Sequence, residues 1–355
     1  MSLEEMRKNI DEVDARIVRL IAERIRQSQS IGYEKQKNNK PIEDAVREEK
    51  VIEHIKAIAR EEKLDEKEAE IIYRQIIKSS KNVQGNVIAY QGEAGAYSEE
   101  VIFRYFGHAV NAKPCEDFDT VFKLVEQGEV SSGVVPIENS LEGSISRVYD
   151  LLLNSSLKVC GELELRIIHN LIANHDATLD TIKKVYSHPQ ALGQCQTFLK
   201  HLGFQLISTY DTAGSVKLIK EQHIIDGAAV ASTRAAEIYD MKILTREIED
   251  NPNNFTRFFV LSKHDSVPTG KDKTSIVFSV KHKPGALYSV LKEFADSKIN
   301  LTKIESRPTR QKAWEYNFYL DFEGHRQDKI VRETMERLEQ YSLFLKTLGS
   351  YPKTI

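Results

Sequence analysis

The sequence predicts a multidomain chain with an all-α N-terminal segment, an α/β middle segment and a small α+β C-terminal module. Three changes of pattern support this division. Residues 1–84 keep a helical period and contain almost no glycine, residues 86–263 alternate short apolar runs with amphipathic ones, and residues 273–355 follow a polar linker. With 355 residues, the chain is long enough for two or three domains that each have their own core.

Composition and charge exclude several function classes. A net charge of −3 lacks the polycationic signature of nucleic-acid binding. Charged residues make up 29% of the chain, and no apolar run approaches the roughly 18 residues of a membrane span. The acidic, amphipathic N-terminus is unlike a targeting peptide. Because Cys115, Cys160 and Cys195 are scattered without metal-ligand spacing, we expect a cytoplasmic protein with no disulfide framework and no metal site.

Residues 1–84 are expected to form three helices. The first covers about residues 3–35, the second contains EDAVREEKVIEHIKAIA, and the third contains EKEAEIIYRQIIKSS. A helix of about 33 residues is about 50 Å long, which is too long for a domain of this size to cover. We therefore expect a homodimer in which the long helices cover each other.

The second helix carries charges where core residues are expected. In EDAVREEKVIEHIKAIA, residues 43–59, an apolar stripe continues toward the N-terminus as Asp44, Arg47 and Glu48. Burying an unpaired charge costs several kcal/mol, so these side chains must be solvated, paired with one another or bound to a ligand.

The other two helices show the same anomaly. Arg24 and Lys35 fall on the apolar stripe of the first helix and Arg7 lies at its edge, while Ser80 continues the stripe of the third and Gln84 flanks it. In one interpretation, long charged side chains reach solvent from a dimer interface. In the other, these residues form an enclosed polar pocket, whose surplus of cations over acids suits a small dianion.

The middle segment alternates strands and helices, which favours α/β architecture with predominantly parallel sheets and two lobes around a cleft. YQGEAGAYSEE follows a strand and opens a helix, so it is either an anion site or a tight turn. VVPIENS ends a strand with Glu138, Asn139 and Ser140, where α/β sheets place ligands. Its alternative is an ordinary helix cap.

Two further motifs follow in the same segment. YSHPQALGQC places Ser187, His188 and Gln190 after a strand, although a lone histidine is more often structural. NPNNFTRFFVLS brings Thr256 and Arg257 into a strand, with a β-bulge and an edge arginine as the alternative. The sequence contains no recognisable Ser/His/Asp order and no P-loop.

The C-terminal module reads strand, helix, strand, strand, helix, strand, the order of a ferredoxin-like fold. Gly285 in KPGALYSVL stands at a strand-to-helix turn, where it permits close approach of backbone or ligand. Pro308 in IESRP restricts the residue before it at a strand end. Both features also fit an ordinary turn and an ordinary strand end.

Residues 1–84 resemble the all-helical chorismate mutases, with MRKNID, AERI, GYEKQK, KPIEDAVREEKV and SSKNVQ in order. The resemblance implies the pericyclic rearrangement of chorismate to prephenate, which needs no nucleophile. The pocket must hold the reactive conformer and stabilise charge that develops on the ether oxygen. By the same resemblance, Arg24 and the partner subunit's Arg7 bind carboxylates, and Arg47 assists them.

The resemblance also implies roles for the remaining polar residues of the helical segment. Lys35 and Gln84 are expected to donate to the ether oxygen, and Glu48 is expected to accept the substrate hydroxyl. Asp44 and Ser80 are expected to orient these groups.

Residues 86–263 resemble prephenate dehydratase, most specifically in TRF and SHPQALGQC. The resemblance implies two periplasmic-binding-protein-like lobes with the site between them, and loss of water and carbon dioxide from prephenate to give phenylpyruvate. The ring hydroxyl must leave, so a hydrogen-bond donor should lie beside it. We expect Thr256 in that position, with Arg257 supporting the site or a carboxylate and Phe258 completing the motif.

The other dehydratase residues receive broader roles. Asn139, Ser140, Ser187 and Gln190 are expected to line the cleft. Glu138 and His188 are each either a proton donor or a structural anchor, and the sequence does not separate these roles.

GALYSVL and IESRP resemble the phenylalanine-binding motifs of the ACT domain in bifunctional chorismate mutase–prephenate dehydratases. The resemblance implies feedback inhibition by phenylalanine at a module–module interface, which requires that phenylalanine favour one quaternary state. It implies no cofactor, and a homodimer with a tetramer as the larger alternative. The implied phenylalanine site comprises Gly285, Ala286, Leu287, Glu305, Ser306, Arg307 and Pro308.

Two other functions compete with this interpretation. A non-catalytic sensor with a solute-binding fold would not need a polar pocket at mutase spacing in its helical segment. A lone mutase with a degenerate middle domain would not keep TRF and SHPQALGQC intact. Both observations favour the bifunctional enzyme.

Overall fold

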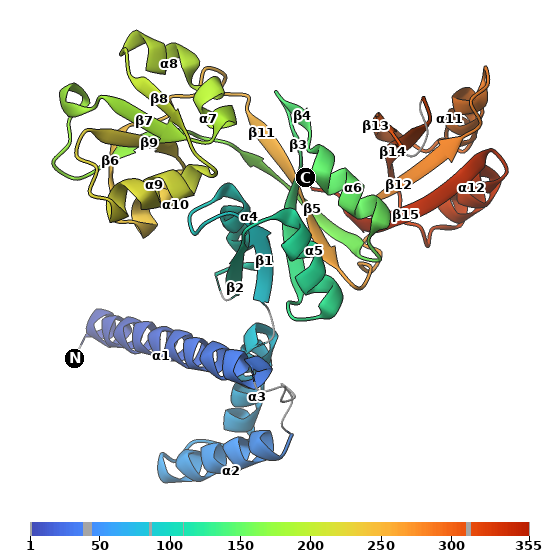
Figure 1. The fold of residues 1–355 in the computed structure, drawn as a ribbon. Helices are drawn as coiled ribbons and strands as arrows, with labels where there is room; N and C mark the ends of the chain where they lie inside the picture. Colours follow the sequence, from blue (N-terminus) through green and yellow to red (C-terminus); the bar gives the residue numbers. More distant parts are fainter. Residues whose placement is uncertain (1, 38–44, 85–86, 109, 310–313, 355) are drawn as a thin grey trace. The chain divides into compact units, whose positions relative to one another are not determined.

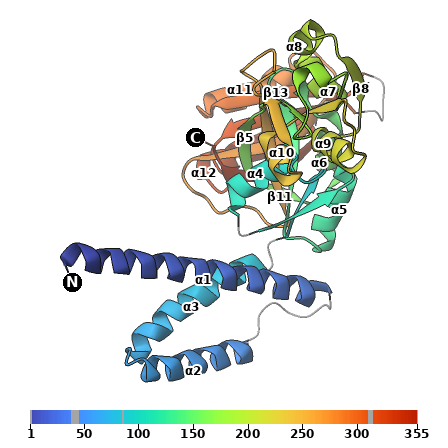
Figure 2. The same ribbon diagram turned by 90° about the vertical axis from the view of Figure 1, so that its left-hand side faces the viewer.

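The computed structural model describes residues 2–37, 45–84, 87–108, 110–309 and 314–354 (Figures 1 and 2). The chain divides into two compact units. The first holds the helical segment up to Ile88 together with two short pieces, Phe106–Asn111 and Glu129–Ser131, and the second holds the rest. Each unit is described by itself.

The helical unit contains one long helix that its other two helices cover only in part. Its helices are α1 (Leu3–Lys37), α2 (Ala45–Glu61) and α3 (Glu66–Gln84), which confirms the long first helix. Figures 1 and 2 show that α1 extends well beyond the part that α3 crosses. The uncovered part presents an apolar row to solvent, comprising Met6, Ile10, Val13, Ile17 and Leu20.

The first lobe of the second unit is a sheet of order β2-β1-β3-β11-β5, with β4 added to β3. Asp117 caps the N-terminus of one of its helices by accepting from Thr120 N at 2.8 Å, and Gly128 ends that helix at φ 76°. The elements are β1 (Val87–Gln91), α4 (Tyr97–Phe106), β2 (Asn111–Cys115), α5 (Phe118–Gln127), β3 (Ser132–Asn139), β4 (Gly143–Ser144), α6 (Ser146–Asn154), β5 (Lys158–Arg166) and β11 (Phe255–Ser262).

The second lobe is a sheet of order β10-β6-β9-β7-β8 around a core that includes Leu171, Val185, Leu199 and Val230. Its strands are apolar on both faces where helices cover them, as in β9, whose residues are all buried. The elements are β6 (Asn170–Ala173), η1 (Leu179–Thr181), β7 (Lys184–Ser187), α7 (Pro189–Gln194), α8 (Gln196–His201), β8 (Gln205–Ser208), α9 (Thr212–Glu221), β9 (Gly227–Ala231), α10 (Thr233–Ile238) and β10 (Lys242–Thr245).

The expectation of predominantly parallel sheets is wrong, because both lobes contain antiparallel strand pairs. Strand β11 runs antiparallel to β3 and β5, and β6 runs antiparallel to β9 and β10, whereas β7 is parallel to β8 and β9. The cause is that the chain passes between the lobes twice, through residues 167–169 and 246–254. One connection leaves the first lobe where the other enters it, so β5 and β11 must run in opposite directions.

The C-terminal module has the expected ferredoxin-like order, in an antiparallel sheet β13-β14-β12-β15. Phe278, Phe294 and Leu320 lie in the core between sheet and helices. Figure 1 shows both helices on the side of the sheet away from β5. The elements are β12 (Asp272–Val280), α11 (Ala286–Asp296), β13 (Leu301–Pro308), β14 (Tyr316–Glu323), α12 (Lys329–Glu339) and β15 (Ser342–Pro352).

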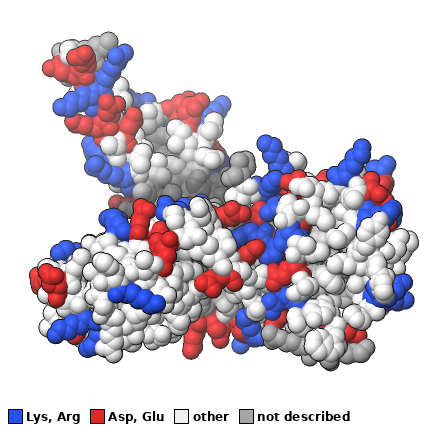
Figure 3. Space-filling model, turned by 90° about the horizontal axis from the view of Figure 1, so that it is seen from above, with Lys and Arg blue, Asp and Glu red and all other residues white. Residues whose placement is uncertain are grey.

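Strand β15 also lies against β5 of the first lobe. A Cβ atom at Gly349 would stand 2.0 Å from Val159 O, so this approach requires glycine. Figure 3 shows acidic and basic side chains interspersed on the visible face. Within the described residues, no helix is long and apolar enough to cross a membrane, and no His, Cys, Asp and Glu side chains group as metal ligands.

Candidate active sites

In the helical unit, Arg24 of α1 and Ser80 of α3 face each other. Arg24 Nη1 donates to Ser80 Oγ, and its guanidinium carbon lies 5.7 Å from the centroid of the Tyr73 ring. Ser80 is only 3% exposed, and its hydroxyl donates to Ile76 O at 2.8 Å. Two of the predicted mutase residues, from helices far apart in the sequence, therefore share one polar contact.

The other predicted mutase residues are spread over the unit. Arg47 and Glu48 stand in the first turn of α2, with Glu48 half-buried. Arg7 is exposed on α1, about 25 Å along the helix axis from Arg24 at 1.5 Å per residue. Within one chain, Arg7 therefore cannot reach the Arg24 contact. Asp44 and the side chains of Lys35 and Gln84 lie outside the described residues.

In the second unit, Asn139 and Thr256 form a cross-strand pair between β3 and β11. Both are buried, and Asn139 Nδ2 donates to Thr256 Oγ1 at 3.0 Å. Asn139 Oδ1 accepts from the backbone N–H groups of Leu141 and Glu142, each at 3.0 Å. Because backbone N–H groups only donate, they fix the amide orientation and direct Nδ2 at the hydroxyl. Thr256 Oγ1 accepts this bond, so its own O–H remains a donor for a ligand.

A buried polar chain continues from Asn139 into the second lobe. Asn139 Nδ2 also donates to Asn254 Oδ1 at 2.7 Å, and Asn254 Nδ2 donates to Gln194 Oε1 at 2.9 Å. His169 Nε2 lies 3.0 Å from Gln194 Oε1, and Tyr97 OH lies 2.9 Å from His169 Nδ1. Sequence reasoning missed Tyr97, His169, Gln194 and Asn254.

Three of these omissions had a signal in the sequence. Asn254 precedes Thr256 by two residues, and residues two apart on an extended chain share a face. Gln194 stands within SHPQALGQC, the motif from which Gln190 was chosen. Tyr97 stands within YQGEAGAYSEE, the motif interpreted as an anion site or a tight turn, whereas His169 carries no signal that marks it without the fold.

The structure separates the other cleft candidates from Thr256. Ser140 Oγ donates to Asn253 O and accepts from Phe255 N, both at 2.9 Å, so it fastens the start of β11. Ser187 is fully buried and donates to Val230 O at 2.7 Å, a contact inside the second lobe.

His188 and Gln190 lie together at the start of α7. His188 is the N-cap residue, and its Nδ1 accepts from Gln190 N at 3.3 Å. Its side chain is half-buried, and that of Gln190 is exposed. Proline at the first helical position suits this cap, because its missing N–H would otherwise be unsatisfied.

Arg257 and Glu138 lie on the opposite face of the sheet from Thr256. Arg257 Nη1 contacts Asp321 Oδ2 of the C-terminal module at 2.7 Å and Glu162 Oε2 at 3.5 Å, while Nη2 contacts Glu138 Oε2 at 3.0 Å. Burial disfavours the charge, but these carboxylates outweigh it and raise the pKa of Arg257. Phe258 returns to the Thr256 face and packs in the core at 2% exposure.

Lys303 of β13 reaches the same face from the C-terminal module. Its Nζ donates to Glu138 Oε2 and Tyr149 OH, each at 2.6 Å, and to Ser144 Oγ at 3.3 Å. Ser144 is the cross-strand partner of Glu138. Lys303 therefore holds the β3–β4 hairpin, whose tip contains Asn139.

Successive residues of IESRP in β13 point alternately to the two faces of the sheet. Glu305 accepts from Ser144 Oγ, and Arg307 Nη1 donates to Ser146 Oγ at 2.9 Å, so both face the dehydratase lobe. Ser306 and Pro308 are exposed on the other side. The four residues thus do not converge on one point within this chain.

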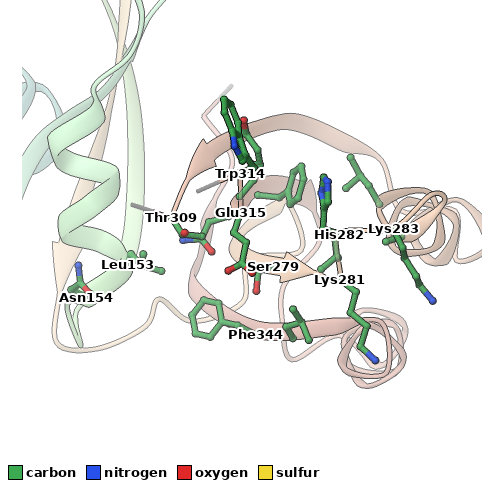
Figure 4. Close-up of a pocket in the computed structure, with 17 residues that line it drawn as sticks. Leu153, Asn154, Ser279, Lys281, His282, Lys283, Thr309, Trp314, Glu315 and Phe344 are labelled. Carbon is green, nitrogen blue, oxygen red and sulfur yellow. The ribbon is translucent and has the colours of Figure 1, made fainter. Parts of the chain in front are cut away.

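A pocket of about 630 Å³ opens on the C-terminal module (Figure 4). Aromatic rings, cationic residues and polar groups line it together, which suits a small zwitterion with an aromatic side chain. It includes Ala286 and Leu287 of the predicted phenylalanine site, but not Glu305 to Pro308. Others of its lining residues are Lys281, His282, Lys283, Trp314, Glu315, Phe318 and Phe344.

Comparison with known proteins places these sites in a family. Residues 6–85 match the model for chorismate mutase type II, residues 88–266 that for prephenate dehydratase and residues 274–340 that for the ACT domain. A bifunctional chorismate mutase/prephenate dehydratase of Aquifex aeolicus is 40% identical over 359 residues, which cover 99% of this chain and 98% of the relative.

Solved structures are similar to about three quarters of the chain. A prephenate dehydratase from Arthrobacter aurescens in complex with L-Phe has a TM-score of 0.69 at 30% identity and covers 75% of this chain and 90% of its own. A structure described as a novel type of quorum quenching acylase has a TM-score of 0.70 at 30% identity and covers 76% and 98%. The same fold thus occurs in proteins described with different chemistries.

The fold, the three domain matches and the sites together define a biosynthetic enzyme with a mutase domain, a dehydratase domain and an ACT domain. The chain belongs to the family of bifunctional chorismate mutase/prephenate dehydratases. It is a bifunctional enzyme of phenylalanine biosynthesis, and its ACT domain provides regulation.

Proposed function

We propose that the helical unit rearranges chorismate to prephenate in a pocket that two chains build together. Arg24 and Ser80 supply one side of this pocket, supported by their contact between α1 and α3. Arg7 lies too far along α1 to join them in the same chain, so it serves the partner's pocket. The exposed apolar row of α1, residues 6–20, supports this pairing because a second copy would remove it from water.

Lys35, Asp44, Arg47, Glu48 and Gln84 keep the roles that the mutase resemblance implies. Lys35 and Gln84 donate to the ether oxygen, and Glu48 accepts the substrate hydroxyl. These groups bind the reactive conformer and stabilise the charge that builds up as the ether bond breaks.

For the dehydratase, Thr256 donates a hydrogen bond to the ring hydroxyl of prephenate as it leaves. The C–C bond to the ring carboxylate breaks and its electron pair enters the ring, which becomes aromatic as the C–O bond breaks. Carbon dioxide departs, and the hydroxyl departs as hydroxide, which takes a proton from solvent to become water. The observation that carries this role is the bond from Asn139 Nδ2 to Thr256 Oγ1, which leaves the threonine O–H as a donor. Such preoriented donors are most effective in a dry site.

Arg257 and Glu138 join the dehydratase to the ACT domain instead of contacting substrate. Supporting this assignment, Arg257 is paired with Asp321 of the ACT domain, and Glu138 is paired with both Arg257 and Lys303. His188, Ser187, Ser140 and Gln190 hold the loops that frame the cleft.

L-Phenylalanine is the proposed effector, bound in the pocket of Figure 4. Its ring would lie among Trp314, Phe318 and Phe344. The complex of the Arthrobacter aurescens relative with L-Phe supports this ligand. Glu305 would transmit occupancy to the β3–β4 hairpin through Ser144, and Arg307 to the start of α6 through Ser146.

Trp314 makes this site directly testable, because it is the only tryptophan of the chain. Adding L-phenylalanine should change its fluorescence in a saturable way and lower dehydratase activity over the same concentration range, whereas D-phenylalanine should do neither. Inhibition without any change in Trp314 fluorescence would place the effector elsewhere.

The compartment and assembly complete the proposal. The free thiols of Cys115, Cys160 and Cys195 support a reducing cytoplasm. A homodimer is the smallest assembly that completes the mutase pocket, and pairing of ACT domains would extend it to a tetramer.

A further inference from the structure

We infer that His169 is a positioning residue for the dehydratase reaction, and that it acts on Thr256 through the side-chain amides of Gln194, Asn254 and Asn139. The inference rests on the proposed role of Thr256 as donor to the leaving hydroxyl. The His169 ring contacts Gln194 and Tyr97, so we argue that its effect on Thr256 passes through the intervening amides.

The orientation of the chain is set at one end by backbone groups. The N–H groups of Leu141 and Glu142 donate to Asn139 Oδ1, so the other amide atom of Asn139 must be the nitrogen. That nitrogen can only donate, and it lies 2.7 Å from a side-chain atom of Asn254. The Asn254 atom must therefore be Oδ1.

The same reasoning continues to the histidine. With Oδ1 of Asn254 facing Asn139, its Nδ2 donates to Gln194 at 2.9 Å, so the Gln194 atom must be Oε1. His169 Nε2 lies 3.0 Å from this oxygen and must carry the proton. In the neutral ring His169 Nδ1 is then an acceptor. The Tyr97 hydroxyl lies 2.9 Å from this nitrogen and 2.7 Å from Ile168 O, so these two acceptors share its single proton.

The environment of His169 supports one neutral tautomer. The ring is 2% exposed, and burial lowers its pKa despite the hydrogen bond to Gln194 and the nearby Glu249. Gln194 Nε2 is buried without a partner among the described residues. The two bonds accepted by Gln194 Oε1 are therefore what hold this amide, and His169 supplies one of them.

The chain of contacts also includes residues from both connections between the lobes. His169 belongs to the first connection between lobes and Asn254 to the second, and Ile167 N of the first donates to Asn254 O at 2.8 Å. Gln194 comes from α7 in the second lobe, and Asn139 and Thr256 come from the first. If the side-chain amide of Gln194 rotated by half a turn, its nitrogen would face the N–H donors of Asn254 and His169. The hydrogen bonds that orient Asn254, and through it Asn139, would then be lost.

The test compares His169→Leu with His169→Gln in the full-length protein, assayed with prephenate and with chorismate. His169→Leu removes the donor, and we expect the dehydratase kcat to fall by up to about a hundredfold with KM within about threefold. The glutamine amide can still donate to Gln194, so His169→Gln should restore most of kcat. Mutase activity should be unchanged in both variants.

A double variant shows whether His169 acts through Thr256. If it does, His169→Leu should cost little further activity in a Thr256→Val background. Full additivity of the two losses, or equal kcat for the leucine and glutamine variants, would overturn the inference. Wild-type kinetics in His169→Leu while Thr256→Val is inactive would reject the role of His169 alone. A Thr256→Val variant with wild-type dehydratase activity would reject the proposed role of Thr256, on which this inference rests.

The tautomer itself can be measured even if His169→Leu does not fold. In protein labelled with 15N-histidine, the signal that disappears in His169→Gln belongs to His169. We expect the 15N shift pattern of a ring protonated at Nε2 and unprotonated at Nδ1. The opposite tautomer would break the chain of donors and contradict the inference.

Discussion

Replacement of Thr256 by valine removes one hydroxyl while keeping the shape of the side chain. Thr256 is buried and accepts one hydrogen bond, from Asn139 Nδ2 at 3.0 Å. After the change, Asn139 Nδ2 keeps Asn254 Oδ1 and the Phe255 carbonyl as acceptors, so no buried donor is stranded. The expected loss of folding free energy is therefore about 0.5–1.5 kcal/mol, that of one net hydrogen bond.

The effect of Thr256→Val on catalysis should be much larger. Loss of a preoriented donor to an oxygen that gains charge costs roughly a hundredfold to a thousandfold in rate, or about 2.7–4 kcal/mol of barrier. We expect this loss in the dehydratase kcat, measured as phenylpyruvate formed from prephenate, with mutase activity intact. Thr256→Ser keeps the hydroxyl and is the matched control. A kcat for Thr256→Val within about threefold of wild type would refute the reasoning.

Two further predictions concern the other domains. Arg24→Met should lower mutase kcat/KM by on the order of a hundredfold without changing the dehydratase, because it removes a carboxylate ligand and the contact with Ser80. An unchanged rate of chorismate consumption would exclude Arg24 from the site. Lys303→Met should leave basal dehydratase kcat within about threefold but weaken phenylalanine inhibition by about tenfold, since Lys303 ties the ACT domain to Glu138 and Ser144. Inhibition at wild-type concentrations of phenylalanine in that variant would show that the coupling runs by another route.

Most of the architecture could be predicted from the sequence, because the spacing of apolar residues indicates where helices and strands lie. The long first helix, the ferredoxin-like order of the last module and the strands at VVPIENS and TRFFVLS all appear in the structure. Sheet direction was not predictable in the same way. It depends on the two connections between lobes, at residues 167–169 and 246–254, and no local pattern records them.

The site was predicted in part, and strand geometry explains the difference. Thr256 and Arg257 are neighbours in the sequence, yet successive side chains of a strand point to opposite faces. Thr256 meets Asn139 on one face, and Arg257 meets Asp321 on the other. The alternation of side chains along a strand is enough to predict that Thr256 and Arg257 point to opposite faces. That Asp321 lies beside Arg257 could be known only from the fold.

The buried chain beside Thr256 was beyond sequence reasoning for a different reason. Asn254, Gln194 and Tyr97 each stand in a motif of the sequence and His169 does not, but all four come from separate segments. Only the fold shows that they form one chain of contacts. The mutase roles of Lys35, Asp44 and Gln84 stay predictions, since the side chains of Lys35 and Gln84 and the whole of Asp44 lie outside the described residues.

The most direct test of the account follows chorismate, prephenate and phenylpyruvate together over time in one reaction. The wild-type protein should consume chorismate and form phenylpyruvate, whereas Thr256→Val should consume chorismate at the wild-type rate and accumulate prephenate. Phenylpyruvate formed by the variant at the wild-type rate would contradict the assignment of Thr256, and unreacted chorismate in both samples would contradict the bifunctional activity itself.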